Sequence, residues 1–180
     1  MTANAQTIPL ALTDLRKIDT VIIAGWAGRD RDAVEHHIKE LEALGVPRPA
    51  RTPTFYELSP EIATTSDDIQ LVGDTSSGEV EAVILAVNGD TYLTVGSDHT
   101  DRQLETVGVA LSKQVCAKPV AKTMWRLDSV ADHWDSLIMR AWAAIDGEER
   151  LYQEGPVSAN LSPWDLADLL AGEKGEDYRN

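Results

Sequence analysis

The sequence contains one cysteine and no long apolar run. Cys116 cannot form an internal disulfide, which fits a reducing compartment. The most apolar stretches, residues 21–27 and 82–87, are far too short to span a bilayer. The N-terminus has no basic start followed by an apolar run, so we expect no signal peptide and a cytoplasmic location.

Basic residues are scarce relative to acidic ones. Sixteen Lys and Arg stand against 30 Asp and Glu, which gives a net charge of −14 and a pI near 4.5. Nucleic acids and anionic membranes require a basic surface, so we expect neither as a partner. With 43% hydrophobic and 26% charged residues, the composition is that of a globular protein, and residues 1–180 are expected to form a single domain.

Several catalytic patterns are also missing. The sequence has no Gly-rich phosphate loop, no Ser-His-Asp order and no Cys/His spacing typical of zinc sites. Phosphate-loop, serine-triad and zinc-site chemistry are therefore not indicated. Any active site must be built from other polar residues.

Periodicity predicts an α+β fold in which short strands dominate and helices lie at the edges. An apolar strand that we expect to be buried leads into a glycine turn, and a helix capped by Asp30 or Asp32 follows. Asn-Gly and Asp-Gly pairs predict two hairpins, and Ser162 with Asp165 forms a capping box for the last helix. The expected strands are 21–24, 54–58, 69–72, 79–87, 91–95, 137–145 and 150–153, and the expected helices are 32–44, 129–135 and one from 162.

Three carboxylates have a spacing that suits one metal site. Glu79 and Glu81 are separated by one residue in a strand, so their side chains project from the same face. Asp98 ends the following turn and adds a third carboxylate. Such an all-oxygen site favours Mg²⁺ or Mn²⁺, with Ca²⁺ as a further option, over zinc. The alternative is an ordinary solvent-exposed edge strand. We place His99 outside the coordination shell, and expect Arg102 to pin the turn or neutralise the carboxylates.

A histidine and a glutamate share one face of the helix expected over residues 32–44. His37 and Glu40 lie three residues apart, which makes them neighbours on a helix surface. Glu40 can orient the imidazole, so that its other nitrogen activates water. The alternative is a solvated helix face, on which the adjacent His36 is a second histidine.

Read in order, these segments resemble the fumarylacetoacetate hydrolase-like superfamily, and within it a small, poorly characterised bacterial branch. The resemblance covers residues 20–170, with residues 1–18 as an N-terminal extension. Four stretches carry it: GWAGRDRDAVEHHIKELEALGVPRP with TPTFYELSP, SGEVEAVIL, VGSDHTDRQLE, and LIMRAWAAIDGEERLYQEG. Each motif alone is unspecific, and their order and combination carry the resemblance.

The resemblance implies a β-roll or sandwich and a metal-dependent hydrolase that cleaves a carbon–carbon bond. The substrate would be a small 2-oxo or 1,3-dicarbonyl acid, as in small-molecule catabolism. Glu79, Glu81 and Asp98 would hold the metal, and His37 with Glu40 would form the lid dyad. Lys118, or alternatively Lys113, would meet the negative charge of the substrate. Decarboxylation or isomerisation of a 2-oxo acid on the same site is an alternative.

The sequence departs from the family at its C-terminal end. Family members continue into a glycine- and threonine-rich pair of strands that is missing here. We therefore weigh an active enzyme against a split or non-catalytic subunit, with a second subunit supplying the strands. Uncovered strand edges also predict a homo-oligomer, at least a dimer.

Overall fold

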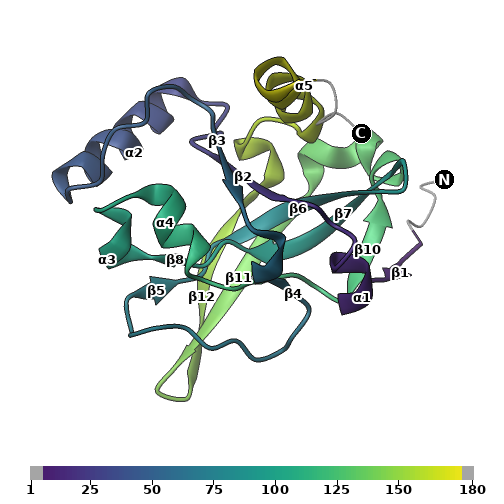
Figure 1. Cartoon of the computed structure of the whole chain (residues 1–180), viewed down its shortest axis with the longest axis horizontal. Coiled ribbons are helices and arrows are strands. Elements are labelled where there is room, and N and C mark those ends of the chain that lie inside the picture. Colours follow the sequence, from purple (N-terminus) through teal and green to yellow (C-terminus); the bar gives the residue numbers. More distant parts are fainter. Residues whose placement is uncertain (1–5, 176–180) are drawn as a thin grey trace.

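The computed structural model describes residues 6–175 and has mixed α+β architecture (Figure 1). Its largest sheet has four strands in the order β1–β10–β7–β6, and all neighbours are antiparallel. The α+β prediction is therefore confirmed. The strands of this sheet are β1 (Ile8–Pro9), β10 (Thr123–Arg126), β7 (Asp90–Ser97) and β6 (Val80–Val87).

The β6–β7 hairpin is the centre of the fold. Its turn residues Asn88 and Gly89 have φ values of 54° and 81°, the left-handed conformation that such a two-residue turn requires. The register runs from Val80 opposite Ser97 to Val87 opposite Asp90. The Asn-Gly pair thus predicted this hairpin correctly.

The other strands form two-stranded pieces around this sheet. The prediction of a strand over 69–72 is wrong. This segment has no strand neighbour, and Val72 is 83% exposed. The strand β2 was expected to be buried, yet its five residues are only half-buried, because it pairs with β3 alone. The pairs are β2 (Val21–Gly25) with β3 (Thr54–Leu58), β4 (Ala63–Thr64) with β9 (Lys118–Pro119), β5 (Ser76–Ser77) with β8 (Thr100–Asp101), and β11 (Ile138–Ile145) with β12 (Glu148–Pro156).

The two longest helices begin at the predicted caps. Asp30 accepts hydrogen bonds from the first turn of α2 (Arg31–Ala43), and Ser162 accepts one from Asp165 in α5 (Pro163–Lys174). The helix expected over 129–135 is instead 3₁₀-helical. The remaining elements are α1 (Leu12–Leu15), α3 (Arg102–Glu105), α4 (Val109–Gln114), η1 (Pro60–Ile62), η2 (Leu127–Ser129), η3 (Ala131–Ser136) and η4 (Val157–Ala159). None of the helices in residues 6–175 is long and apolar enough to cross a membrane.

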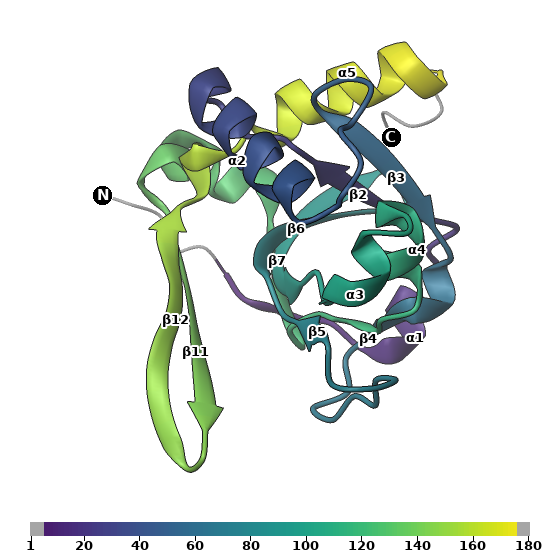
Figure 2. The same ribbon diagram turned by 90° about the vertical axis from the view of Figure 1, so that its left-hand side faces the viewer.

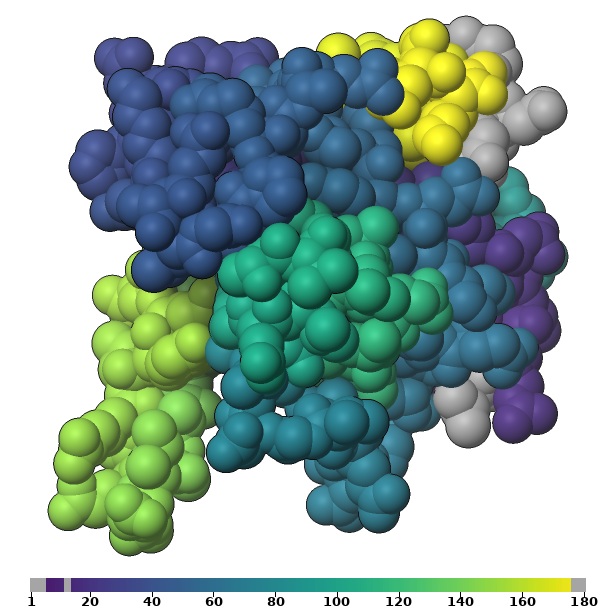
Figure 3. All heavy atoms as spheres, turned by 60° about the vertical axis from the view of Figure 1, so that its left-hand side comes forward, coloured from purple at the N-terminus to yellow at the C-terminus, as the bar shows by residue number. Residues whose placement is uncertain are grey.

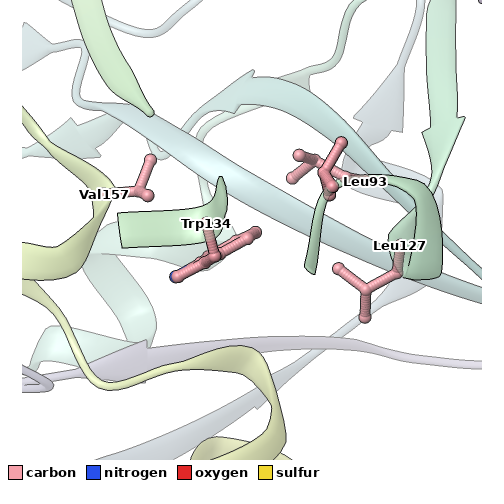
Figure 4. Packing of buried hydrophobic residues seen from close by; sticks show 5 residues of the cluster. Leu93, Leu127, Trp134 and Val157 are labelled. Carbon is pink, nitrogen blue, oxygen red and sulfur yellow. The ribbon is translucent and has the colours of Figure 1, made fainter. Parts of the chain in front are cut away.

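Buried side chains cover both faces of the β6–β7 hairpin. On one face, Figure 4 shows Leu93, Leu127, Trp134 and Val157 gathered into a cluster. The opposite face carries Leu85, which packs with two leucines from the N-terminal segment. This double cover fixes the hairpin, and with it the residues at the start of β6.

The β11–β12 hairpin extends away from the rest of the molecule as an arm (Figure 2). Its turn residues Asp146 and Gly147 have φ values of 53° and 80°, so the Asp-Gly pair also predicted a hairpin correctly. In the space-filling view the same arm protrudes in light green (Figure 3). Several large apolar side chains of this arm are exposed.

Candidate functional site

The three predicted carboxylates lie on one face of the β6–β7 hairpin. The backbone N–H of Asp98 donates to the carbonyl of Glu79 at 2.8 Å, and Glu81 lies opposite Gly96. Residues that face each other across an antiparallel pair project to the same side. Glu79, Glu81 and Asp98 therefore share a face, which continues along β6 with Val83 and Leu85.

Glu79 is held by an arginine from α3. The Arg102 Nη2 donates to Glu79 Oε1 at 2.7 Å, and its Nη1 donates to Glu105 Oε2 at 3.1 Å. The Nε of the same guanidinium donates to Ser77 Oγ at 2.6 Å. Arg102 thus contacts two carboxylates and one hydroxyl, which is compatible with either role considered from the sequence. Glu105, which sequence reasoning missed, is buried and balances the same arginine.

Asp98 is buried between two lysines. The Lys113 Nζ donates to Asp98 Oδ2 at 2.5 Å and to Thr100 Oγ1 at 3.2 Å. The Lys118 Nζ lies 3.3 Å from Asp98 Oδ1, yet that oxygen accepts no hydrogen bond. Asp98 therefore has one oxygen hydrogen-bonded to an ammonium, and a second, buried oxygen that is ion-paired with Lys118 but accepts no hydrogen bond.

The two lysines differ in what their ammonium groups contact. Lys118 donates to the backbone carbonyls of His99, Lys113 and Cys116, at 2.5, 2.6 and 3.3 Å. Burial lowers the pKa of Lys118, while Asp98 acts in the opposite direction. Because its three protons bind main-chain oxygens, Lys118 ties the turn at His99 to the end of α4 and the residues that follow it. Among the described residues, Lys113 has no hydrogen bonds to carbonyls, and its ammonium pairs instead with Asp98 and Thr100.

Glu81 has no hydrogen bond to its side chain among the described residues. Burial raises its pKa to about 7, and Glu79 and Asp98 add to this rise, while Lys113 opposes it. A carboxylate that is half-buried, unpaired and next to two others is costly to ionise. This is the electrostatic environment that a bound cation would relieve.

These residues border a hollow of about 1610 Å³ between the β6–β7 hairpin and the layer formed by β2, β3, α2 and α5. Its charged end is lined by Glu79, Glu81, Asp98, Arg102, Glu105, Lys113 and Lys118. Apolar side chains line much of the remainder, among them Ile22, Phe55, Leu85 and Leu166. The hollow can therefore admit a molecule that has an acidic end and an apolar end.

The predicted dyad lies at this hollow, on α2. His37 lines it, and the His37 ring centroid is 5.6 Å from that of Trp26. The His37 Nδ1 is 3.6 Å from Glu40 Oε2, while the neighbouring His36 Nδ1 is 3.4 Å from the other oxygen. The side chain of His37 is 61% exposed, so the dyad belongs to the open rim rather than to the buried charged end.

The donor chemistry fits a hard divalent cation, although the side chains are not drawn together around one point. Within residues 6–175 there is no group of three or more His, Cys, Asp or Glu side chains close enough to hold an ion as they stand. Glu79 is turned to Arg102, and Asp98 to Lys113. Two observations favour a cation: Glu81 accepts no side-chain hydrogen bond among the described residues, and the buried Asp98 Oδ1 lacks a hydrogen bond. His99 has a buried Nδ1 without a partner, and burial lowers its pKa.

Sequence reasoning missed one contact that shapes the site. The backbone N–H of Val80 donates to Gln153 Oε1 at 2.8 Å, which ties the base of the arm to the start of β6. Gln153 also lines the hollow. The Gln at the end of the arm motif was visible in the sequence, but nothing there identified its acceptor role.

A family model described as "Protein of unknown function (DUF2848)" matches residues 24–179. No curated protein matches the sequence. Two crystal structures of Cg1458, a protein of the fumarylacetoacetate hydrolase superfamily, have the same fold.

The similarity to Cg1458 is structural rather than close in sequence. One structure has a TM-score of 0.58 at 15% identity and covers 81% of this chain and 56% of that chain. The other structure, solved with inhibitor, has a TM-score of 0.62 at 18% identity. It covers 88% of this chain and 62% of that chain. The chain thus spans about three fifths of the length of Cg1458. At such identities the match establishes the fold alone.

Proposed function

Because the chain belongs to the DUF2848 family and has the fold of Cg1458, we propose that it is a metal-dependent enzyme acting on a small 2-oxo or 1,3-dicarbonyl acid. The observation that supports this most is the cluster of Glu79, Glu81 and Asp98 on one strand face, at the charged end of the hollow. Its unpaired Glu81 has a pKa raised to about 7.

The proposed reaction is hydrolysis of a carbon–carbon bond. Glu79, Glu81 and Asp98 would hold Mg²⁺ or Mn²⁺, which would polarise the oxo-acid oxygens of the substrate. His37, oriented through Nδ1 by Glu40, would accept a proton from water at its other nitrogen. The water oxygen bonds to the acyl carbon, the carbon–carbon bond breaks, and its electron pair leaves with the other fragment, which is then protonated.

The cations around the cluster would balance the charge of the acid. Lys113 and Lys118 both line the hollow, but the Lys113 ammonium is not bound to main-chain carbonyls, so Lys113 would be the lysine that meets the carboxylate or the developing oxyanion. Lys118 would act mainly by holding the loop that carries Asp98. This modifies the role expected for Lys118 and favours Lys113, which the sequence left as the alternative.

Decarboxylation of a 2-oxo acid is the second candidate, and one observation favours it. His37 is on the open rim, where its Nδ1 lies 3.6 Å from Glu40 Oε2, while the carboxylate cluster is at the charged end of the hollow. Decarboxylation needs no activated water, so it would use only the residues at the charged end of the hollow. A non-catalytic binding subunit is the third possibility, because Glu79 and Asp98 are already paired with protein cations.

An assay with Mn²⁺ against acylpyruvates and oxaloacetate separates these candidates. We expect turnover of at least one compound by the purified protein, and loss of that turnover with a chelator or in Glu81→Gln. Glu149→Gln, at an exposed position on β12, should leave turnover unchanged. Two acids as products indicate hydrolysis, whereas carbon dioxide indicates decarboxylation. No turnover of any compound would contradict the enzyme proposal and favour a binding subunit.

A further inference from the structure

A tryptophan beside the hollow has a backbone conformation that large side chains rarely adopt. Trp26 has a φ of 60° and is one of three non-glycine residues with positive φ in the described part of the chain. The other two, Asn88 and Asp146, are in hairpin turns that require this conformation, whereas Trp26 lies between β2 and α2. Positive φ is strained for a large residue, and such strain persists only where neighbouring contacts hold it.

Backbone hydrogen bonds hold the turn that contains Trp26. The Ala27 carbonyl accepts from the N–H of Leu161 at 2.8 Å, and the Arg29 N–H donates to the carbonyl of Ala159 at 2.9 Å. Both bonds join the turn after β2 to the segment that leads into α5. The chain around Trp26 therefore has little freedom to rotate to a relaxed φ.

The neighbouring strand β3 fixes the direction of the indole. The Trp26 Nε1 donates to Tyr56 Oη at 3.1 Å. A Cβ at position 25 would lie 2.7 Å from Tyr56 Cε2, so a residue larger than Gly25 would push the Tyr56 ring away. Gly25, Trp26 and Tyr56 all line the hollow. The indole is thus held at the hollow from both its backbone and its ring nitrogen.

The fixed indole contacts one of the two adjacent histidines. Its ring centroid is 5.6 Å from that of His37, and the ring planes are inclined by 48°. Attractive aromatic pairs have centroids roughly 4.5–7 Å apart. Glu40 does not distinguish His37 from His36, because it lies close to the Nδ1 atoms of both. Among the described residues, His37 alone of the two has a ring contact and lines the hollow.

We infer that Trp26 is a positioning residue, which holds the His37 imidazole over the hollow. This inference rests on the proposed role of His37 as the group that accepts a proton from water. The His37 side chain is mostly exposed, so few other contacts restrict its rotamer. Proton transfer requires the accepting nitrogen to be within hydrogen-bonding distance of the water. A ring held in place before the substrate binds meets this requirement more often, which raises the rate without contact between Trp26 and the reacting atoms.

NMR tests the contact without a substrate. The ring current of the indole should shift the Cε1–H signal of His37, identified by its loss in His37→Gln, away from that of His36. Trp26→Asn should move the His37 signal toward that of His36, because asparagine tolerates positive φ but carries no aromatic ring. Tyr56→Phe, which leaves Trp26 unchanged and removes only the acceptor of its N–H, should cause a smaller shift in the same direction. Trp142→Asn, at an exposed tryptophan on the arm, should leave the signal unchanged.

An unchanged His37 signal in both Trp26→Asn and Tyr56→Phe would overturn the inference, whether or not the protein is active. This measurement is made on the metal-free protein. It therefore does not depend on the proposed reaction.

Turnover of the compound identified as a substrate separates positioning from substrate binding. Trp26→Asn should lower kcat about tenfold and leave KM nearly unchanged, because the geometry of the base is lost while the binding groups remain. Trp26→Phe, which keeps an aromatic ring, should recover most of kcat. In a His37→Ala background, Trp26→Asn should cause no further loss, because a residue that acts through His37 then has nothing to position.

A further loss in that double variant, or an effect of Trp26→Asn on KM alone, would overturn the positioning role and leave the proposed reaction intact. If the wild type turns over no compound, the proposed function fails. The His37 signal then decides whether Trp26 holds the ring.

Discussion

Replacing His37 with alanine is expected to lower turnover about 100-fold, the usual scale for loss of a general base. His37 lines the hollow on α2, and Glu40 is the carboxylate that can orient its ring. Glu40→Gln should therefore have an effect of similar size. Neither change should alter the affinity for Mn²⁺, because the dyad lies on another element from the carboxylate cluster. The measurement is the turnover rate, in the presence of Mn²⁺, of the compound identified as a substrate.

The neighbouring histidine provides the control for this prediction. His36 is also close to Glu40, with its Nδ1 3.4 Å from Oε1, but its side chain is 75% exposed and it does not line the hollow. His36→Ala should keep the wild-type rate. If His37→Ala also keeps the wild-type rate, the dyad takes no part in the reaction. A mechanism without activated water is then favoured.

Replacing Glu81 with glutamine is expected to stabilise the metal-free protein at neutral and higher pH. The folded state raises the pKa of Glu81 from an ordinary 4.5 to about 7, mainly through burial. The folded protein therefore binds this proton more tightly than the unfolded chain does. As pH rises from 4.5 through 7, the free energy of unfolding falls by about 3 kcal/mol on account of this group. The glutamine variant does not ionise and avoids this loss.

Denaturant unfolding between pH 5 and 8, in the presence of a chelator, measures the effect. The wild type should lose stability relative to Glu81→Gln as pH rises, and the difference should level off above pH 7. Glu149→Gln on β12 should follow the wild type at every pH, because its side chain is exposed. Parallel profiles for wild type and Glu81→Gln would mean that Glu81 ionises freely in the folded state.

Local signals predicted the elements that depend on a few residues. Asn88-Gly89 and Asp146-Gly147 predicted both hairpins, since few other pairs adopt positive φ so readily. Ser162 marked the start of one long helix, and Asp30, one of the two caps considered, marks the start of the other. The alternation of Glu79 and Glu81 placed both on one face, because the period of a strand leaves no other choice.

Features set by tertiary packing could not be read in the same way. The pairing of Lys113 with Asp98 depends on where the short helix α4 packs, and six residues carry too little periodicity to place it. The apolar segment 21–24 indicated a buried strand, but burial depends on neighbours that only the three-dimensional arrangement supplies. The prediction of a strand over 69–72 was wrong for a related reason, because an apolar run forms a strand only beside a partner strand.

The response of the melting temperature to Mn²⁺ tests the proposed metal site most directly, because it requires no substrate. At pH 8, a hundredfold excess of Mn²⁺ over its dissociation constant should stabilise the folded wild type by about 2.7 kcal/mol, if the ion binds only that state. For a domain of this size, this corresponds to a rise of roughly 5–10 °C in Tm. Glu81→Gln should lose most of the rise, and Glu149→Gln should retain it. An equal rise, or none, in wild type and Glu81→Gln would contradict a metal site built on Glu79, Glu81 and Asp98.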